Sequence, residues 1–142
     1  MKFRAVAERT FPVENGVIDR SLTVGEDGKT RPAPFGQGVK AETEYRVVKR
    51  PGRSSYVDIY PKTVFPHQIR AHFAYIKHPL FADALYGATY SREFQNNALL
   101  QAYYLRFKKG DSKEVLEIEL SPSEQIMRAF DFAEREQAEN AG

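Results

Sequence analysis

The segment KTVFPHQIRAHF, residues 62–73, joins a predicted strand to a predicted helix and holds the most informative chemistry of the sequence. Pro66 favours a helix start, because the first N–H groups of a helix stay unpaired and proline has none to lose. Apolar side chains then recur at i, i+4 and i+7, as one helix face requires: Ile69, Phe73 and Ile76. His78-Pro79 predicts the end of this helix near residue 77, because the residue before proline avoids the helical conformation.

Arg70 lies near the start of this helix, where the helix dipole disfavours a positive charge. Two interpretations of Arg70 stay open. It pairs with a nearby acid for structural reasons, or it is aimed at a carboxylate or phosphate in a cleft, which a planar guanidinium binds through two hydrogen bonds. His67 and Lys77 share a helix face with Arg70, away from the apolar stripe.

Alternating apolar residues on either side of this segment predict five strands, at residues 2–8, 43–50, 56–60, 99–107 and 114–120. The second and third form an antiparallel pair across a Pro-Gly turn, and the last two form another. Asn15-Gly16 is a turn signal, and residues 23–39 read as a long loop. The last strand is expected to turn its apolar residues toward the core: Leu116, Ile118 and Leu120.

The sequence after this strand, Ser121-Pro122-Ser123-Glu124, is a capping-box pattern, with Pro122 at the first helical position. It predicts a final helix over about residues 122–137. Strands outnumber helices and are joined by short turns. The fold class is therefore α+β, with a mainly antiparallel or mixed sheet and a few helices.

Composition excludes several classes of protein. The 142 residues contain no cysteine, so disulfides, thiolate nucleophiles and cysteine-based metal sites are absent. The three histidines lack metal-ligand spacing, and we expect neither a metal nor a cofactor. No apolar run is long enough for a membrane span or a signal peptide, so a cytoplasmic protein is expected. Residues 1–110 hold 18 Lys and Arg against 10 Asp and Glu, whereas residues 111–142 hold 3 against 9. The basic part either favours a polyanionic partner or is ordinary solvated surface, and charge alone leaves both interpretations open.

The segment 62–73 resembles the T-G-R-T-H-Q-I-R-x-H-L motif of the RluA-type RNA pseudouridine synthases. Other segments resemble further motifs of that family in the same order: Gly16-Val17-Ile18-Asp19, residues 41–47, His78-Pro79-Leu80 with Asp83 and Leu85-Tyr86-Gly87, and residues 100–107. The matches cover about residues 3–122. The resemblance implies a pseudouridine synthase fold, RNA as the partner, and isomerisation of uridine to pseudouridine in ribosomal or transfer RNA.

The same resemblance implies a catalytic aspartate in an R-L-D motif upstream of all these segments, paired with an arginine that corresponds to Arg70. No R-L-D occurs in this sequence, and no catalytic aspartate is found in it. Phe3 stands where the family has a tyrosine that packs on the target base, and its ring can still stack. The chain is therefore expected to be inactive alone.

The sequence also departs from the family at positions around the site. The Gly-Arg pair before the helix is Val64-Phe65, two further family glycines are Lys77 and Ala82, and a family histidine is Gln101. A β-branched residue in place of glycine is expected to change the turn before the helix. The family's glycines near the site are lost, whereas its apolar core positions are retained. This difference indicates that the fold is maintained while the requirements on the site are relaxed.

These features describe one partial pseudouridine synthase-like domain over residues 1–142. It is either a part of an enzyme that obtains its aspartate elsewhere, or a non-catalytic module that binds RNA or a partner. The residues expected to contact RNA are His67, Gln68, Arg70, Lys77, Arg46 and Arg4. Arg70 is expected to be free to bind an anion, and Asp83 to serve a turn. An open sheet edge is expected to favour a homo-oligomer or a missing N-terminal half.

Overall fold

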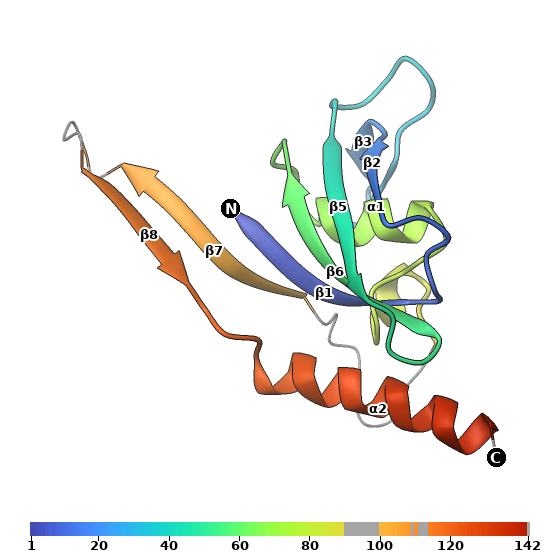
Figure 1. Cartoon of the computed structure of the whole chain (residues 1–142). Coiled ribbons are helices and arrows are strands. Elements are labelled where there is room, and N and C mark those ends of the chain that lie inside the picture. Colours follow the sequence, from blue (N-terminus) through green and yellow to red (C-terminus); the bar gives the residue numbers. More distant parts are fainter. Residues whose placement is uncertain (90–99, 109, 111–113, 142) are drawn as a thin grey trace.

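Six strands form one sheet in the order β2-β5-β6-β1-β7-β8, and every neighbouring pair is antiparallel (Figure 1). The computed structural model describes residues 1–89, 100–108, 110 and 114–141. The strands of this sheet are β1 (Lys2–Glu8), β2 (Asn15–Asp19), β5 (Glu42–Lys49), β6 (Ser54–Pro61), β7 (Leu100–Lys108) and β8 (Val115–Glu119). A separate hairpin pairs β3 (Leu22–Val24) with β4 (Thr30–Pro32), and the helices are α1 (Gln68–Tyr75), the 3-10 turn η1 (Ala84–Tyr86) and α2 (Glu124–Ala141).

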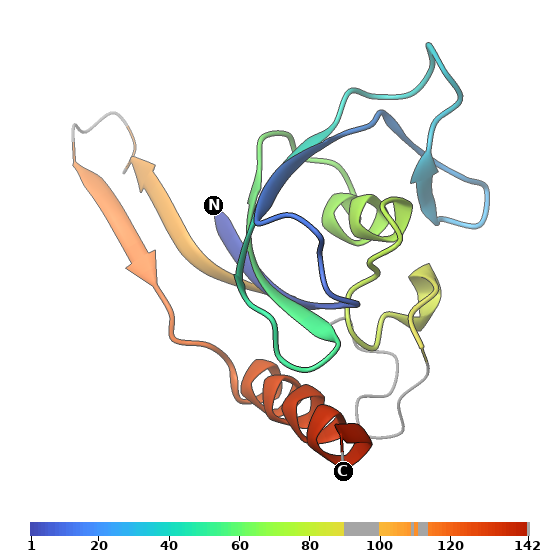
Figure 2. The same cartoon turned by 45° about the vertical axis from the view of Figure 1, so that its right-hand side comes forward.

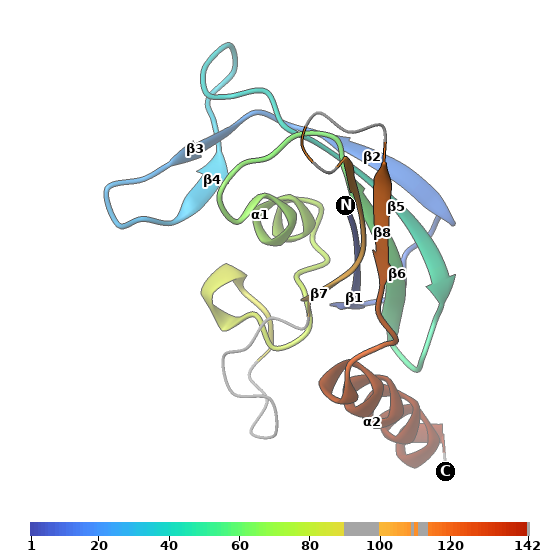
Figure 3. The same ribbon diagram turned by 90° about the vertical axis from the view of Figure 1, so that its left-hand side faces the viewer.

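The two faces of the sheet are covered by different helices. The sheet curls around α1, which packs on what we call the inner face (Figure 2). That core joins Ala5 and Ile59 of the strands to Ile69 and Phe73 of α1. Side chains alternate between faces along a strand, so Val6 points to the opposite, outer face, where it packs with Ile126 and Ala129 of α2 (Figure 3).

The strands β7 and β8 extend past β1, away from α1 (Figure 1). The prediction that the apolar residues of the last strand face the core is wrong for Ile118 of β8 and for Leu120 directly after it, which are 48% and 51% exposed. The reason lies in α2, which packs its apolar stripe against Val6 and Tyr56 of the central strands. The alternating pattern correctly predicts the strand. Within the described residues, however, no helix packs over Ile118 and Leu120 at this end of the sheet.

Two local predictions fail for identifiable reasons. Asn15-Gly16 lies inside β2 instead of a turn, because both residues pair with β5. The Tyr45 side chain lies against Gly16, where a Cβ would come within 2.6 Å of the Tyr45 hydroxyl oxygen. The predicted loop over residues 23–39 contains most of the β3–β4 hairpin. The remaining predicted strands are confirmed where the structure describes them; residue 99 and most of the β7–β8 turn lie outside those residues.

Both helix starts differ from the sequence pattern. Helix α1 begins two residues after Pro66, because His67 has the left-handed angles φ 54° and ψ 25°. At α2 the capping residue is Ser123, whose Oγ accepts the N–H of Ile126 at 3.2 Å, so Pro122 precedes the helix. The predicted α+β class and the C-terminal helix are confirmed, and that helix continues to residue 141.

Candidate functional site

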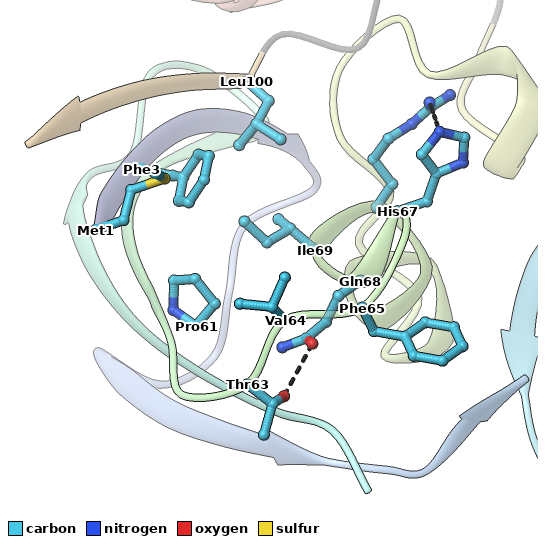
Figure 4. Close-up of a pocket in the computed structure, with 11 residues that line it drawn as sticks. Met1, Phe3, Pro61, Thr63, Val64, Phe65, His67, Gln68, Ile69 and Leu100 are labelled. Atoms are coloured by element: carbon cyan, nitrogen blue, oxygen red, sulfur yellow. Dashed lines mark hydrogen bonds between the residues drawn. The ribbon is translucent and has the colours of Figure 1, made fainter. Parts of the chain in front are cut away.

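An apolar cavity of about 430 Å³ opens on the inner face, between the start of β1 and the N-terminal end of α1 (Figure 4). Its apolar lining is Met1, Phe3, Pro61, Val64, Phe65, Ile69 and Leu100. Its polar lining is Thr63, His67, Gln68 and Arg70. We call it the inner cavity. Its volume lies within the range of roughly 300–1,000 Å³ that is usual for small-ligand sites.

The geometry of the inner cavity favours a flat, weakly polar group. The ring of Phe3 forms one wall, with Leu100 and Ile69 beside it (Figure 4). Val64 forms part of the opening and is 99% exposed. Aromatic rings stack on other planar rings, so the inner cavity can receive an unstacked nucleobase. Val64, which the resemblance matches to a glycine, does not have a left-handed φ. This agrees with the expectation that a β-branched residue cannot adopt a turn that requires glycine.

Arg70 forms the most deeply buried ion pair among the described residues. Its Nε and Nη2 atoms donate to the two carboxylate oxygens of Asp83 at 2.9 and 2.7 Å, a two-pronged geometry. Asp83 is fully buried beside η1. Hydrogen bonding to this carboxylate raises the pKa of Arg70 above its usual value. The expectation of a free Arg70 is therefore wrong, and Asp83 is more than a turn residue.

His67 links Arg70 to Tyr86. The His67 Nδ1 lies 3.0 Å from the Tyr86 hydroxyl, which also accepts the N–H of Thr30 at 3.2 Å. The remaining guanidinium nitrogen of Arg70, Nη1, lies 3.4 Å from His67 Nε2. A neutral His67 that accepts from Arg70 at Nε2 and donates from Nδ1 to Tyr86 satisfies every contact. Lys29 lies over the same Tyr86 ring, 5.1 Å from its centroid.

Gln68 is buried and fully hydrogen-bonded inside the protein. Its amide donates to the Glu42 carbonyl at 3.1 Å and to Thr43 Oγ1 at 3.0 Å, and its oxygen accepts from Thr63 Oγ1 at 2.9 Å. Thr43 Oγ1 in turn lies 2.7 Å from Nδ1 of His72. This chain of bonds fixes the Gln68 side chain at the wall of the inner cavity.

His72 closes this chain of hydrogen bonds in the core. Its Nε2 lies 2.8 Å from the Arg20 carbonyl oxygen, so Nε2 donates and Nδ1 accepts from Thr43. Burial lowers the pKa of His72 below its usual value. The neutral His72 ring therefore supports, through Thr43, the Gln68 side chain that lines the inner cavity.

The residues expected to contact RNA fall on two faces. His67, Gln68 and Arg70 line the inner cavity. Arg4 and Arg46 both lie opposite Asp58 in the strand register, which places them on the outer face. The sequence interpretation gave no role to Thr63 or Tyr86, although the L-Y-G segment containing Tyr86 was one of its motifs. Lys77 lies past the end of α1 with a left-handed φ of 70°.

Among the described residues, neither an aspartate nor a glutamate lines the inner cavity. The same residues contain no group of three side chains that could hold a metal ion. No helix in the described part of the chain is long and apolar enough to cross a membrane.

No protein-family model matches the chain. It is 31% identical over 94 residues to an uncharacterized RNA pseudouridine synthase of Chloroflexus aurantiacus, covering 66% of this chain and 30% of that protein. It is 31% identical over 129 residues to ribosomal large subunit pseudouridine synthase D of Haemophilus ducreyi, covering 82% and 39%. A dual-specificity RNA pseudouridine synthase RluA of Vibrio cholerae is 36% identical over 73 residues, covering 51% and 30%.

Two solved structures share the fold. Human RNA pseudouridylate synthase domain containing 4 superposes with a TM-score of 0.73 at 18% identity, over 93% of this chain and 61% of that one. Human RNA pseudouridylate synthase domain containing 1 gives a TM-score of 0.67 at 19% identity, over 92% and 64%. The chain spans between 30% and 39% of the length of the first two curated relatives.

Proposed function

This chain belongs to the RluA-type RNA pseudouridine synthase family as a divergent and partial member, and on that premise we propose that it is a pseudouridine synthase-like RNA-binding protein. It takes an unpaired base of ribosomal or transfer RNA into the inner cavity. It does not isomerise uridine alone. Its proposed location is the cytoplasm, where such RNA is found.

The shape of the inner cavity supports base binding. Phe3 offers a ring for stacking, and Ile69 and Leu100 exclude water from the rest of the site. Sequence-specific recognition of RNA commonly uses bases that are splayed out and stacked on aromatic side chains. Thr63 and His67 supply the polar groups at the wall.

The bond between Arg70 and Asp83 is the observation that carries the proposed inactivity. The resemblance implies an arginine at position 70 that pairs with the reacting aspartate, but here two of the three guanidinium nitrogens are held by the fully buried carboxylate of Asp83. Asp83 cannot attack a base without breaking this pair and reaching the surface. The described part of the cavity wall offers no other carboxylate.

The test uses RNA labelled with tritium at C5 of uracil, incubated with the purified chain. Pseudouridine formation joins the base to ribose through C5 and releases that tritium, so release should stay at background. Release that disappears when an aspartate of this chain is replaced would overturn the proposed inactivity.

Binding is measured separately on the same RNA. Phe3→Ala should weaken it by about fivefold or more, as expected for a lost stacking contact of at least about 1 kcal/mol. Phe35→Ala is the matched control, because the Phe35 ring is exposed and does not line the inner cavity. Equal affinities of the two variants would refute base binding at Phe3.

A second candidate function, docking of a protein partner, is favoured by the exposed apolar residues of β8. Ile118 and Leu120 lie on one face of the edge strand, and β8 leaves backbone groups unpaired along its outer side. A second copy of this chain, or another polypeptide that pairs with β8, would cover both. A well-folded monomer in sedimentation at tens of micromolar would count against the homo-oligomer.

A further inference from the structure

A second concave site lies on the outer face of the sheet, on the opposite side from the inner cavity. It has a volume of about 450 Å³ and is formed by strands β2, β5 and β6. The side chains that line it are Asn15, Val17, Glu44, Arg46 and Tyr60, and we call it the outer groove. Gly16 and Tyr45 also line it, but their register directs them to the inner face, so the backbone of these two residues faces the groove.

The strand register explains why polar residues meet at this place. Asn15 pairs with Arg46, and Arg46 pairs with Asp58. In the next row Val17 pairs with Glu44, and Glu44 pairs with Tyr60. Directly opposite residues of antiparallel strands point to the same face. The two rows therefore put a guanidinium, an amide and a phenol ring side by side on the outer face, beyond the residues against which α2 packs.

The hydrogen-bonding groups of this site differ in how far they are already used. Glu44 is paired with Lys62 at 3.2 Å. Arg46 is exposed and forms no ion pair or hydrogen bond through its side chain with any residue in the described ranges. The side-chain amide of Asn15 is likewise unused by the described residues. The outer groove thus offers donors to a ligand. Glu44, the one acid among its lining residues, is paired with Lys62, and Asp58 lies opposite Arg46 on the same face, outside the lining.

The surroundings of the groove add positive charge beside tyrosine rings, of which Tyr103 is buried. Lys2 lies 5.6 Å from the centroid of the Tyr60 ring and 4.6 Å from that of Tyr104. Arg4 stacks on Tyr103 at 3.7 Å. Cations and aromatic rings interleaved on an open sheet are the combination that binds single-stranded nucleic acids, in which rings stack with bases and cations follow the phosphates.

We propose that the outer groove is a second binding site for single-stranded RNA, in which a base stacks on Tyr60 and Arg46 holds an adjacent phosphate. Asn15 then lies within reach of the base or ribose. The site is separate from the inner cavity and needs neither Phe3 nor Arg70.

The experiment measures binding of short single-stranded RNA by fluorescence anisotropy as a function of salt. Arg46→Ala should weaken binding and reduce the slope of log affinity against log salt by about one, because one phosphate contact is lost. Arg53→Ala removes the same charge from the exposed β5–β6 turn, outside the groove, and should leave the slope unchanged. Equal slopes for the two variants would overturn the proposal.

Two Tyr60 variants separate stacking from hydrogen bonding. Tyr60→Phe keeps the ring and should retain affinity, whereas Tyr60→Leu should lose about fivefold or more. Circular dichroism shows whether each variant is folded. If Tyr60→Leu does not fold, the Arg46 and Arg53 comparison decides alone.

Failure of this proposal is distinguishable from failure of base binding in the inner cavity. The effects of Phe3→Ala and Arg46→Ala should add, because the two residues lie on opposite faces and share no partner. RNA that carries a photoreactive uridine should crosslink to a peptide of β5 or β6 containing groove residues, in the Phe3→Ala variant as well. Crosslinks confined to inner-face residues would place all binding at the inner cavity and refute the outer site.

Discussion

Ile59 and Ile118 are both central isoleucines of antiparallel strands in the same sheet, yet Ile59 is fully buried and Ile118 is 48% exposed. Ile59 belongs to the body, residues 1–89, where α1 covers the inner face. Ile118 belongs to the arm, formed by β7 and β8, which extends past the body (Figure 1). The difference shows that alternation of apolar residues forms a strand, whereas burial depends on a second layer that this pattern does not specify.

The polar contacts of the two regions differ in the same way. In the body, Arg70 and Asp83 form a two-pronged pair with a fully buried carboxylate. In the arm, Arg106 and Glu117 lie 3.7 Å apart with both side chains more than half exposed. Water screens the arm pair and leaves it with little effect on stability, whereas the body pair fixes η1 against α1. The comparison can be tested pair by pair.

The largest difference is expected between the two ion pairs. Asp83→Ala should lower the free energy of unfolding by about 3 kcal/mol or more, because it leaves Arg70 partly buried without its partner. Glu117→Ala should change it by less than about 1 kcal/mol. Urea unfolding of both variants provides the measurement. Similar losses would mean that the arm is as tightly held as the body.

The two isoleucines form the next pair. Ile59→Ala should cost about 2–4 kcal/mol, since it opens a cavity in the core beside Phe73. Ile118→Ala should cost less than about 1 kcal/mol in the monomer, because water already contacts this side chain. A cost for Ile118→Ala that rises with protein concentration would instead show that the arm is buried in an oligomer.

The pH dependence of stability should come in part from His72 in the body. Its folded-state pKa lies below the usual value of about 6.5, so the unfolded chain binds the proton more readily. Stability from the neutral ring is fully present above pH 6.5 and is lost as the pH falls through the folded-state pKa. Asp19 opposes this loss by favouring the charged ring.

Urea unfolding at several pH values compares wild type with His72→Asn, which cannot gain a proton in this range. The difference in unfolding free energy between them should shrink as the pH falls below 6.5. Hydrogen exchange at the backbone amides of the arm should depend on the charge of His72 only where exchange requires global unfolding of the protein. A difference that stays constant over this range would refute the role of His72.

The sequence predicted most strands of the body and the family, because alternation, helical spacing and short motifs are local signals. It could not predict the partner of Arg70, since Asp83 lies 13 residues away and only the packing of η1 on α1 brings them together. For a similar reason it could not predict that Arg4 and Arg46 lie on the outer face, opposite to the face that carries Arg70. Strand register fixes which face a residue occupies, and one sequence does not show the register directly.

Two non-glycine residues of the body have backbone angles that favour glycine. Lys77 and Ala82, which the family resemblance matches to glycines, have left-handed angles, φ 70° and 65°. A residue with a Cβ is strained in this region by about 1 kcal/mol or more. The body tolerates the strain because α1 and the strand bridge between Ala7 and Leu80 hold the connecting segment on both sides.

Lys77→Gly should therefore stabilise the protein, by at most about 1 kcal/mol, because relief of the strained φ exceeds the added freedom of the unfolded chain. The Lys77 side chain is largely exposed, and its carbonyl, which accepts a bond from Arg9 at 3.0 Å, is retained in the variant. Lys40→Gly is the matched control, an exposed lysine without a left-handed φ, and should be neutral or slightly destabilising. The gain should appear in urea unfolding of the body while amide exchange at the exposed edge of β8 stays unchanged. A loss of stability on Lys77→Gly would mean that the side chain contributes more through its contacts than the left-handed backbone costs.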